Sequence, residues 1–189
     1  LFYGGMVSVK SSTNMMMMTF GACAIVGVLW VLFGFSMTFG TSTGGFVGSI
    51  TEFAGMKDML ESQTTVSGLP VSLFALFQAL FAAITVALIS GAVADRMKFS
   101  AWAIFVPVWS LLVYVPVFKW VYGGWLGQRG SIDFAGGTAI HVNAGIAALA
   151  AVLVLGKRRG WPQEGHPPHS MPLVMIGTGI LWFGWFGFK

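Results

Sequence analysis

The stretch Asp133-Phe-Ala-Gly-Gly-Thr-Ala-Ile-His141-Val-Asn-Ala-Gly145 opens a long hydrophobic run with an acidic residue and two glycines, and places a histidine eight residues further on. Histidine is costly inside a segment that crosses lipid, so His141 is a functional candidate by default. Asp133, Gly137, His141 and Gly145 are four residues apart and share one stripe on an α-helix. Glycines on both sides of His141 would let another helix come close to it. The pattern predicts a transmembrane helix whose imidazole is buried against protein.

Two interpretations of His141 follow from its chemistry. A neutral imidazole donates one hydrogen bond and accepts one, so it could hold a small polar solute in a dry passage. It could equally be a structural histidine whose hydrogen bonds are satisfied by a neighbouring helix. Asp133 is also open to two interpretations. Its position favours a helix N-cap, and its charge would attract a cation at that end of the helix.

The composition is that of an integral membrane protein. Of the 189 residues, 56% are hydrophobic and only 8% are charged, whereas soluble domains carry roughly 25% charged residues. The basic excess lies mostly in loops and indicates membrane topology rather than a nucleic-acid-binding surface. We therefore predict an all-α fold, a polytopic transmembrane helix bundle in a lipid bilayer.

Five hydrophobic runs approach the ~20 residues that a helix needs to cross a bilayer. They cover about residues 15–39, 69–94, 99–121, 134–155 and 171–188, and residues 7–14 are predicted to form a polar turn. The chain begins as if inside a helix end and stops as the last run finishes. We expect one transmembrane domain over residues 1–189, truncated at both ends.

The loops predict an orientation. Six basic residues fall in alternate turns, which should be cytoplasmic: Lys10, Arg96, Lys98, Lys157, Arg158 and Arg159. The loop before Asp133 would then face outward, and its aromatic residues could attract a cation through their ring faces. These residues are Trp120, Tyr122 and Trp125. Phe77 and Phe81 share a face of the 69–94 helix with Phe74, a stripe typical of packing and less often of a pore.

The sequence lacks motifs typical of metal sites, nucleotide-binding sites and catalytic nucleophiles. His166 and His169 stand in a proline-rich loop away from His141, whereas a zinc site needs three or four convergent ligands. There is no phosphate-binding or dinucleotide fingerprint and no nucleophile elbow. We expect no metal, no cofactor and no enzyme activity.

The stretch from Asp133 to Ala144 resembles the signature of the ammonium transporter family, which includes the methylammonium permeases and, more distantly, the Rhesus proteins. Further matching blocks follow in the family's order over essentially the whole chain: Leu1–Gly5, Ile84–Gly91, Ala94–Arg96, Phe99–Ala101, Gly156–Arg158 and Gly184–Phe188. The resemblance implies a homotrimer in the plasma membrane whose subunits each have eleven helices and their own pore. This chain would hold the end of the first helix through the sixth.

The resemblance also implies roles for individual residues. His141 resembles the first of two pore histidines, and Asp133 the acid that shapes the outer recruitment site. Phe81 and Phe188 resemble the stacked pair that closes the outer vestibule, with Phe77 one turn away. Where the family usually has a tryptophan in the outer loop, this sequence has Tyr122. Either Tyr122 or its neighbours Trp120 and Trp125 would supply the aromatic wall.

The implied function is transport of ammonium or ammonia, with methylammonium as a further substrate. A PII-type regulatory protein would dock near Lys157–Arg159, although topology alone also explains those charges. The alternative is an ammonium sensor built on the same bundle. An intramembrane enzyme would need a nucleophile or metal ligands near His141, and a passive pore for neutral solutes would need paired half-helix motifs. Neither feature is found in the sequence.

Overall fold

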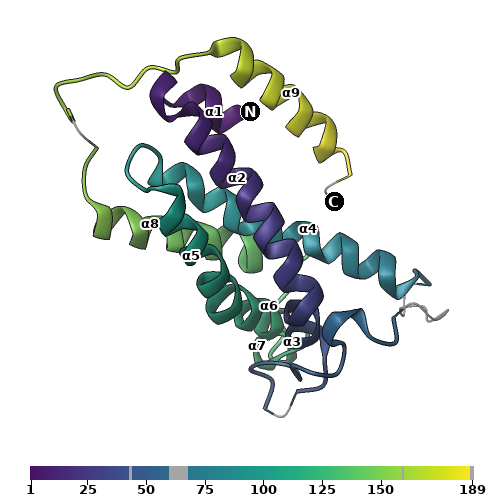
Figure 1. Ribbon diagram of the computed structural model, residues 1–189. Coiled ribbons are helices and arrows are strands. Elements are labelled where there is room, and N and C mark those ends of the chain that lie inside the picture. The colour runs from purple at the N-terminus through teal and green to yellow at the C-terminus, as the bar shows by residue number, and fades with distance from the viewer. Residues whose placement is uncertain (43, 60–67, 159, 188–189) are drawn as a thin grey trace.

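Every regular element is helical among the residues that the computed structural model describes, which are 1–42, 44–59, 68–158 and 160–187 (Figure 1). Within these residues, four helices are long and apolar enough to cross a membrane: Val9–Phe39, Val71–Val93, Phe99–Gln128 and Gly137–Leu155. A fifth apolar helix, Met171–Trp185, is shorter. The predicted all-α transmembrane bundle is confirmed.

Two of the long helices are interrupted by a π-helical turn, and a third begins with one. The α-helices are α1 (Phe2–Met6), α2 (Val9–Leu29), α3 (Phe35–Phe39), α4 (Val71–Ser90), α5 (Phe99–Trp109), α6 (Val115–Val121), α7 (Trp125–Gln128), α8 (Asn143–Leu155) and α9 (Met171–Trp185). The π-helical turns are Trp30–Gly34, Ser110–Tyr114 and Gly137–Val142, and short 3₁₀ turns cover Ala54–Met56 and Gly91–Val93. Such turns inside α-helices often mark functional sites.

The first long helix begins at Val9, earlier than the predicted Met15. Much of the segment predicted as a polar turn is therefore helical. Tertiary contacts explain the difference, because Ser12 is buried and the Asn14 side-chain amide donates to the Met97 backbone oxygen at 3.3 Å. Polar residues continue the helix beyond the apolar run once they have partners in the turn between α4 and α5.

The core lies where α2 packs between α4 and α5. Two buried indoles tie the three helices together. The Trp30 Nε1 donates to the Ala75 oxygen of α4 at 3.0 Å, and the Trp102 Nε1 of α5 donates to the Met18 oxygen of α2 at 2.8 Å. Each bond satisfies a buried donor, whose loss would cost about 1–3 kcal/mol. These contacts hold α4, which carries the phenylalanine stripe, in a fixed position.

The basic turns that the sequence assigns to the cytoplasm lie at one end of the bundle, opposite α3 and α7 (Figure 1). Arg96 donates to the backbone oxygens of Ala92 and Gly156, which belong to the C-terminal ends of two helices. Arg158 lies 3.7 Å from the Asp95 carboxylate. A guanidinium at helix C-termini is favourable because the helix dipole is negative there. Arg96 thus joins the ends of the α4 and α8 segments.

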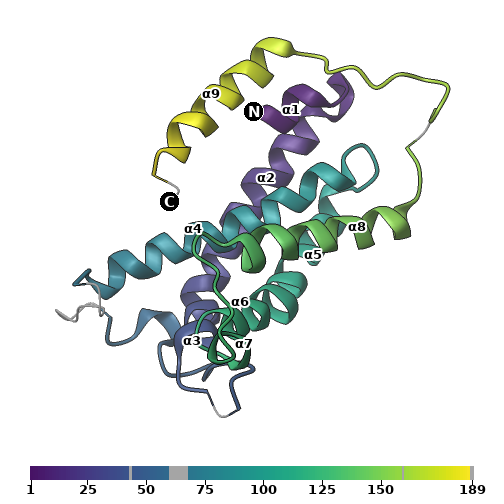
Figure 2. The same ribbon diagram turned by 180° about the vertical axis from the view of Figure 1, so that it is seen from behind.

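Helix α9 runs beside α1, as both ribbon views show (Figures 1 and 2). Two glycines allow the close approach. A Cβ on Gly177 would lie 2.5 Å from the Phe2 nitrogen, and one on Gly5 would lie 2.8 Å from the Ser170 oxygen. The Ser170 N–H also donates to the Gly5 oxygen at 3.3 Å. The position of α9 therefore depends on backbone-to-backbone contact.

We expect Gly177→Ala to destabilise the protein by about 1–3 kcal/mol, because the added methyl meets backbone that cannot rotate away. Gly179→Ala is the matched control, since nothing lies within 4 Å of a Cβ there. Alanine should be neutral or stabilising at that helical position. Thermal unfolding of the detergent-solubilised protein measures both effects. Equal unfolding midpoints for the two variants would contradict the close α1–α9 contact.

Candidate functional site

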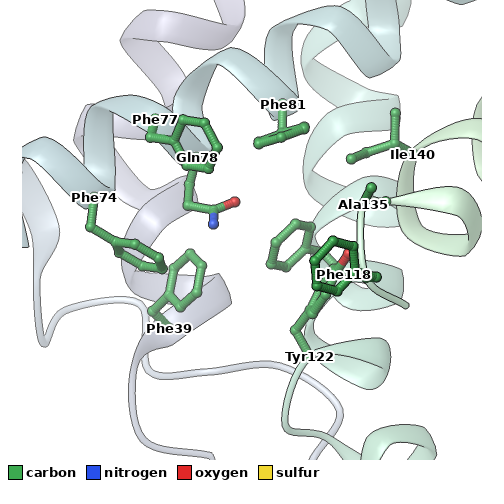
Figure 3. A pocket seen from close by; sticks show the side chains of 11 residues that line it. Phe39, Phe74, Phe77, Gln78, Phe81, Phe118, Tyr122, Ala135 and Ile140 are labelled. Atoms are coloured by element: carbon green, nitrogen blue, oxygen red, sulfur yellow. The ribbon is translucent and has the colours of Figure 1, made fainter. Parts of the chain in front are cut away.

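An aromatic cavity of about 310 Å³ lies near α3 and α6 at the end opposite the basic turns (Figure 3). Its walls include Phe74, Phe77 and Phe81 of α4, together with Phe118 and Tyr122. The three α4 rings recur at helical spacing, which places them on one side of the helix. The stripe noted in the sequence therefore faces a cavity as well as the core. We call this space the outer cavity.

A second, larger cavity of about 780 Å³ lies between α4 and α9 and is bordered by His141 and Trp185. We call it the inner chamber. Phe77 and Phe81 line both spaces, and their ring centroids are 4.9 Å apart at an interplanar angle of 88°. The two rings therefore form a partition between the outer cavity and the inner chamber. Phe188, the predicted stacking partner of Phe81, lies outside the described residues.

His141 occupies the π-helical turn Gly137–Val142, and its side chain is exposed to the inner chamber. The prediction of an imidazole buried against a neighbouring helix is wrong for the described part of the chain. The reason is the course of α9, which lies against α1 instead of covering this face. Gly145 shares the exposed face, and no atom lies within 4 Å of the place that a Cβ would take there.

Asp133 lies in the loop before the His141 helix and caps the first turn of that helix. Its Oδ2 accepts hydrogen bonds from the N–H groups of Thr138 and Ala139, both at 2.9 Å. The helix begins at Gly137, after the predicted start at residue 134, because Gly136 adopts a left-handed conformation with φ of 83°. Asp133 therefore caps the helix with its side chain, although it is neither the N-cap residue nor part of the predicted stripe.

Tyr122 connects this capping arrangement to the outer cavity. Its ring lines the cavity and packs on Phe118 with centroids 4.5 Å apart. Its hydroxyl lies near the Asp133 carboxylate and the Gly136 backbone. One side chain thus joins an aromatic wall, an acidic group and the turn that begins the His141 helix.

The two neighbouring tryptophans lie outside the outer cavity. Trp120 donates from Nε1 to the Phe46 oxygen at 3.0 Å, and its ring lies 6.1 Å from that of Trp125. The Arg129 guanidinium sits 5.5 Å from the Trp125 ring centroid, so a cation already occupies one face of that ring. Of the three aromatic residues considered from sequence, Tyr122 is the one that lines the cavity.

Sequence reasoning missed several residues of the outer cavity, among them Phe39, Phe118 and Ile140. A signal for Phe118 was present, because it precedes Tyr122 by one helical turn and so shares its face. Phe39 carried no such signal. It reaches the cavity through the π-helical turn Trp30–Gly34, which changes the helical register before α3.

We expect Gly136→Ala to lower stability by about 1–3 kcal/mol, because its φ of 83° strains any side chain and the new methyl meets Ile140. Gly137→Ala is the matched control. A Cβ there meets only the Asp133 Oδ1 at 3.9 Å. The unfolding midpoint in detergent checks this pair. If Gly136→Ala unfolds at the same temperature as Gly137→Ala, the left-handed turn is not required.

Comparison with known proteins gives matches over the full length of the chain. The family model described as "Ammonium Transporter Family" matches residues 1–189. The chain is similar to the "Ammonium transporter" of Mycobacterium tuberculosis, with 47% identity over all of this chain and 45% of that protein. The crystal structure of Saccharomyces cerevisiae Mep2 superposes with a TM-score of 0.85 and 36% identity, covering 99% of this chain and 44% of that one.

A further similar structure is titled "Sensor Amt Protein". It superposes with a TM-score of 0.87 and 28% identity over 99% of this chain and 48% of that one. Taken together, the chain spans about half the length of the curated relatives and solved structures that it matches.

Proposed function

The chain belongs to the ammonium transporter family, and on this premise we propose that the complete protein carries ammonium or ammonia across the plasma membrane. The four long apolar helices make it a multi-pass membrane protein. The observation that carries the proposal is the pair of adjoining cavities, one aromatic and one bordered by His141, with Phe77 and Phe81 between them.

The outer cavity suits recruitment of a small cation. Each aromatic face attracts a cation by roughly 0.5–2 kcal/mol, more when water is excluded. Tyr122 brings such a face to the cavity beside the negative charge of Asp133. Ammonium would collect here, and methylammonium has the same charge and N–H donors.

The partition favours passage of the neutral form. Moving a bare cation into an apolar region costs several kcal/mol even after relaxation, and the rings of Phe77 and Phe81 offer no counter-charge. Ammonium would release its proton on the outer side, ammonia would pass the two rings, and the proton would cross separately, so that transport carries a current. In the inner chamber the His141 imidazole would then exchange hydrogen bonds with ammonia.

Family membership also supports a homotrimer and a PII-type partner on the basic side near Lys157 and Arg158. These two proposals rest on resemblance. The mass of the purified complex would test the first, and co-purification with such a protein would test the second.

Transport is tested with the complete gene product in proteoliposomes. An ammonium gradient should drive uptake that saturates with concentration and is lacking in liposomes without protein. Folded protein that binds ammonium but moves none would overturn the transporter proposal.

Binding of ammonium without uptake would favour an ammonium sensor. The similarity to a sensor Amt structure is the observation that supports this alternative. The bundle would then bind ammonium in the same outer cavity and report occupancy. An ammonium-dependent change in an attached signalling activity, without uptake, would distinguish this function.

A further inference from the structure

Gln78 places an amide among the aromatic rings of the outer cavity. It follows Phe77 on α4 and lines the same space as Phe74 and Phe81. In the close view its side chain extends from α4 into the space between the rings, with the amide group at its tip (Figure 3). A polar tip in this position is exceptional, since the cavity wall is otherwise mostly apolar.

The hydrogen-bonding capacity of this amide is unused within the described part of the chain. No described residue donates to or accepts from the Gln78 side chain, which is half-buried. Tyr122, the other side chain with a polar tip on this wall, has its hydroxyl near the Asp133 carboxylate and the Gly136 backbone. A glutamine amide has an oxygen that accepts and a nitrogen that donates. Gln78 therefore keeps an acceptor available to whatever enters the cavity.

An amide acceptor adds a property that aromatic rings lack. Ring faces attract cations through a quadrupole with little regard for the identity of the ion. An amide oxygen instead forms a hydrogen bond with a donor that points at it, as an N–H of ammonium can. Potassium needs several oxygens to replace its hydration shell, and one amide cannot supply them. Ammonium can give one N–H to the amide and direct the others at the rings.

We propose that Gln78 is a specificity-determining residue, which accepts a hydrogen bond from an N–H of the cation held in the outer cavity and so selects cations that carry N–H groups. This inference rests on the proposed transport function, because it assigns a substrate contact to that route.

The test compares wild type, Gln78→Leu and Gln128→Leu in the complete protein, with ammonium-evoked current recorded in proteoliposomes. Leucine fills similar space without an amide. Gln128 is an exposed glutamine on α7, outside the cavity, and provides the matched control. A hydrogen bond to a charged group corresponds to roughly ten- to a hundredfold in binding. The KM for ammonium should rise by about that factor in Gln78→Leu, with little change in maximal current.

Tetramethylammonium separates lost recognition from a deformed cavity, because it is a cation without N–H groups. Its inhibition of the current should be equally strong in wild type and Gln78→Leu. An unchanged ammonium KM overturns the inference, as does a loss of tetramethylammonium inhibition that matches the rise in ammonium KM. If Gln78→Leu does not fold, Gln78→Met decides by the same comparison. A wild-type protein without ammonium current would instead overturn the proposed function.

Discussion

Replacing His141 with leucine is expected to reduce the ammonium current of the complete protein by at least about tenfold. Apart from His141 and the indole of Trp185, the described residues that border the inner chamber are apolar or glycine. Ammonia that has left water would lose its main hydrogen-bonding partner in the chamber. One such bond is worth about 1–3 kcal/mol when the alternative is an unsatisfied polar group. A barrier higher by that amount slows passage by roughly ten- to a hundredfold.

Current recorded from proteoliposomes at a saturating ammonium gradient measures this effect. His141→Gln should retain more current than His141→Leu, because an amide still donates and accepts. His166→Leu is the matched control for loss of a histidine, since His166 lies in the loop between α8 and α9, away from the chamber. Wild-type current in His141→Leu would remove His141 from the proposed route.

Replacing Asp133 with alanine is expected to have the second large effect, on both stability and transport. The change leaves the N–H groups of Thr138 and Ala139 without their side-chain acceptor. It also removes the carboxylate beside the Tyr122 hydroxyl. Loss of a helix cap costs up to about 2 kcal/mol, and hydrogen bonds to a charged group about 1.5–3 kcal/mol each. We expect a total loss of about 2–4 kcal/mol, because the two bonds share one acceptor atom.

Asp133→Asn separates capping from charge. An asparagine oxygen can still accept from both N–H groups, so this variant should unfold at a temperature close to that of wild type. Its ammonium KM should nevertheless rise, because the negative charge beside the outer cavity is gone. Thermal unfolding and uptake measured on the same preparations give both readings. An alanine variant as stable as wild type would contradict the capping role.

The bundle could be predicted from sequence because hydropathy in membrane helices is a strong and local signal. The helix from Phe99 to Val121 shows this best, since its predicted ends agree with α5 and α6. The early start at Val9 could not be predicted, because it depends on Asn14 finding a partner at Met97. Tertiary contacts of that kind leave no trace in a hydropathy pattern.

The sequence indicated which residues belong to the candidate site better than it indicated how they are arranged. His141, Phe77, Phe81, Tyr122 and Asp133 were named from sequence. The first four line one or both of the two adjoining cavities, and Asp133 lies in the loop before the His141 helix. The four-residue spacing that suggested one stripe was misleading. An α-helical repeat does not apply across the left-handed Gly136 or the π-helical turn that follows it, and neither feature has a firm sequence signature.

The outer loop shows the other limit of sequence reasoning. Trp120 and Trp125 are close in sequence to Tyr122 and equally suited to a cation, so composition could not separate them. Their directions are set by partners distant in sequence, such as the Phe46 oxygen that binds the Trp120 indole. Side-chain direction in an irregular loop follows from such long-range contacts.

A thiol placed in the wall of the outer cavity tests most directly whether the substrate passes through that cavity on its way to the inner chamber. Ala135 lines the outer cavity, and Cys23 is the one cysteine of these 189 residues. In a cysteine-free background of the complete protein that includes Cys23→Ala, Ala135→Cys would be treated from the outer side with a positively charged methanethiosulfonate, while ammonium current is recorded and modification is followed by mass spectrometry. We predict that modification stops the current and that saturating ammonium slows the reaction. Complete modification with undiminished current would contradict the route.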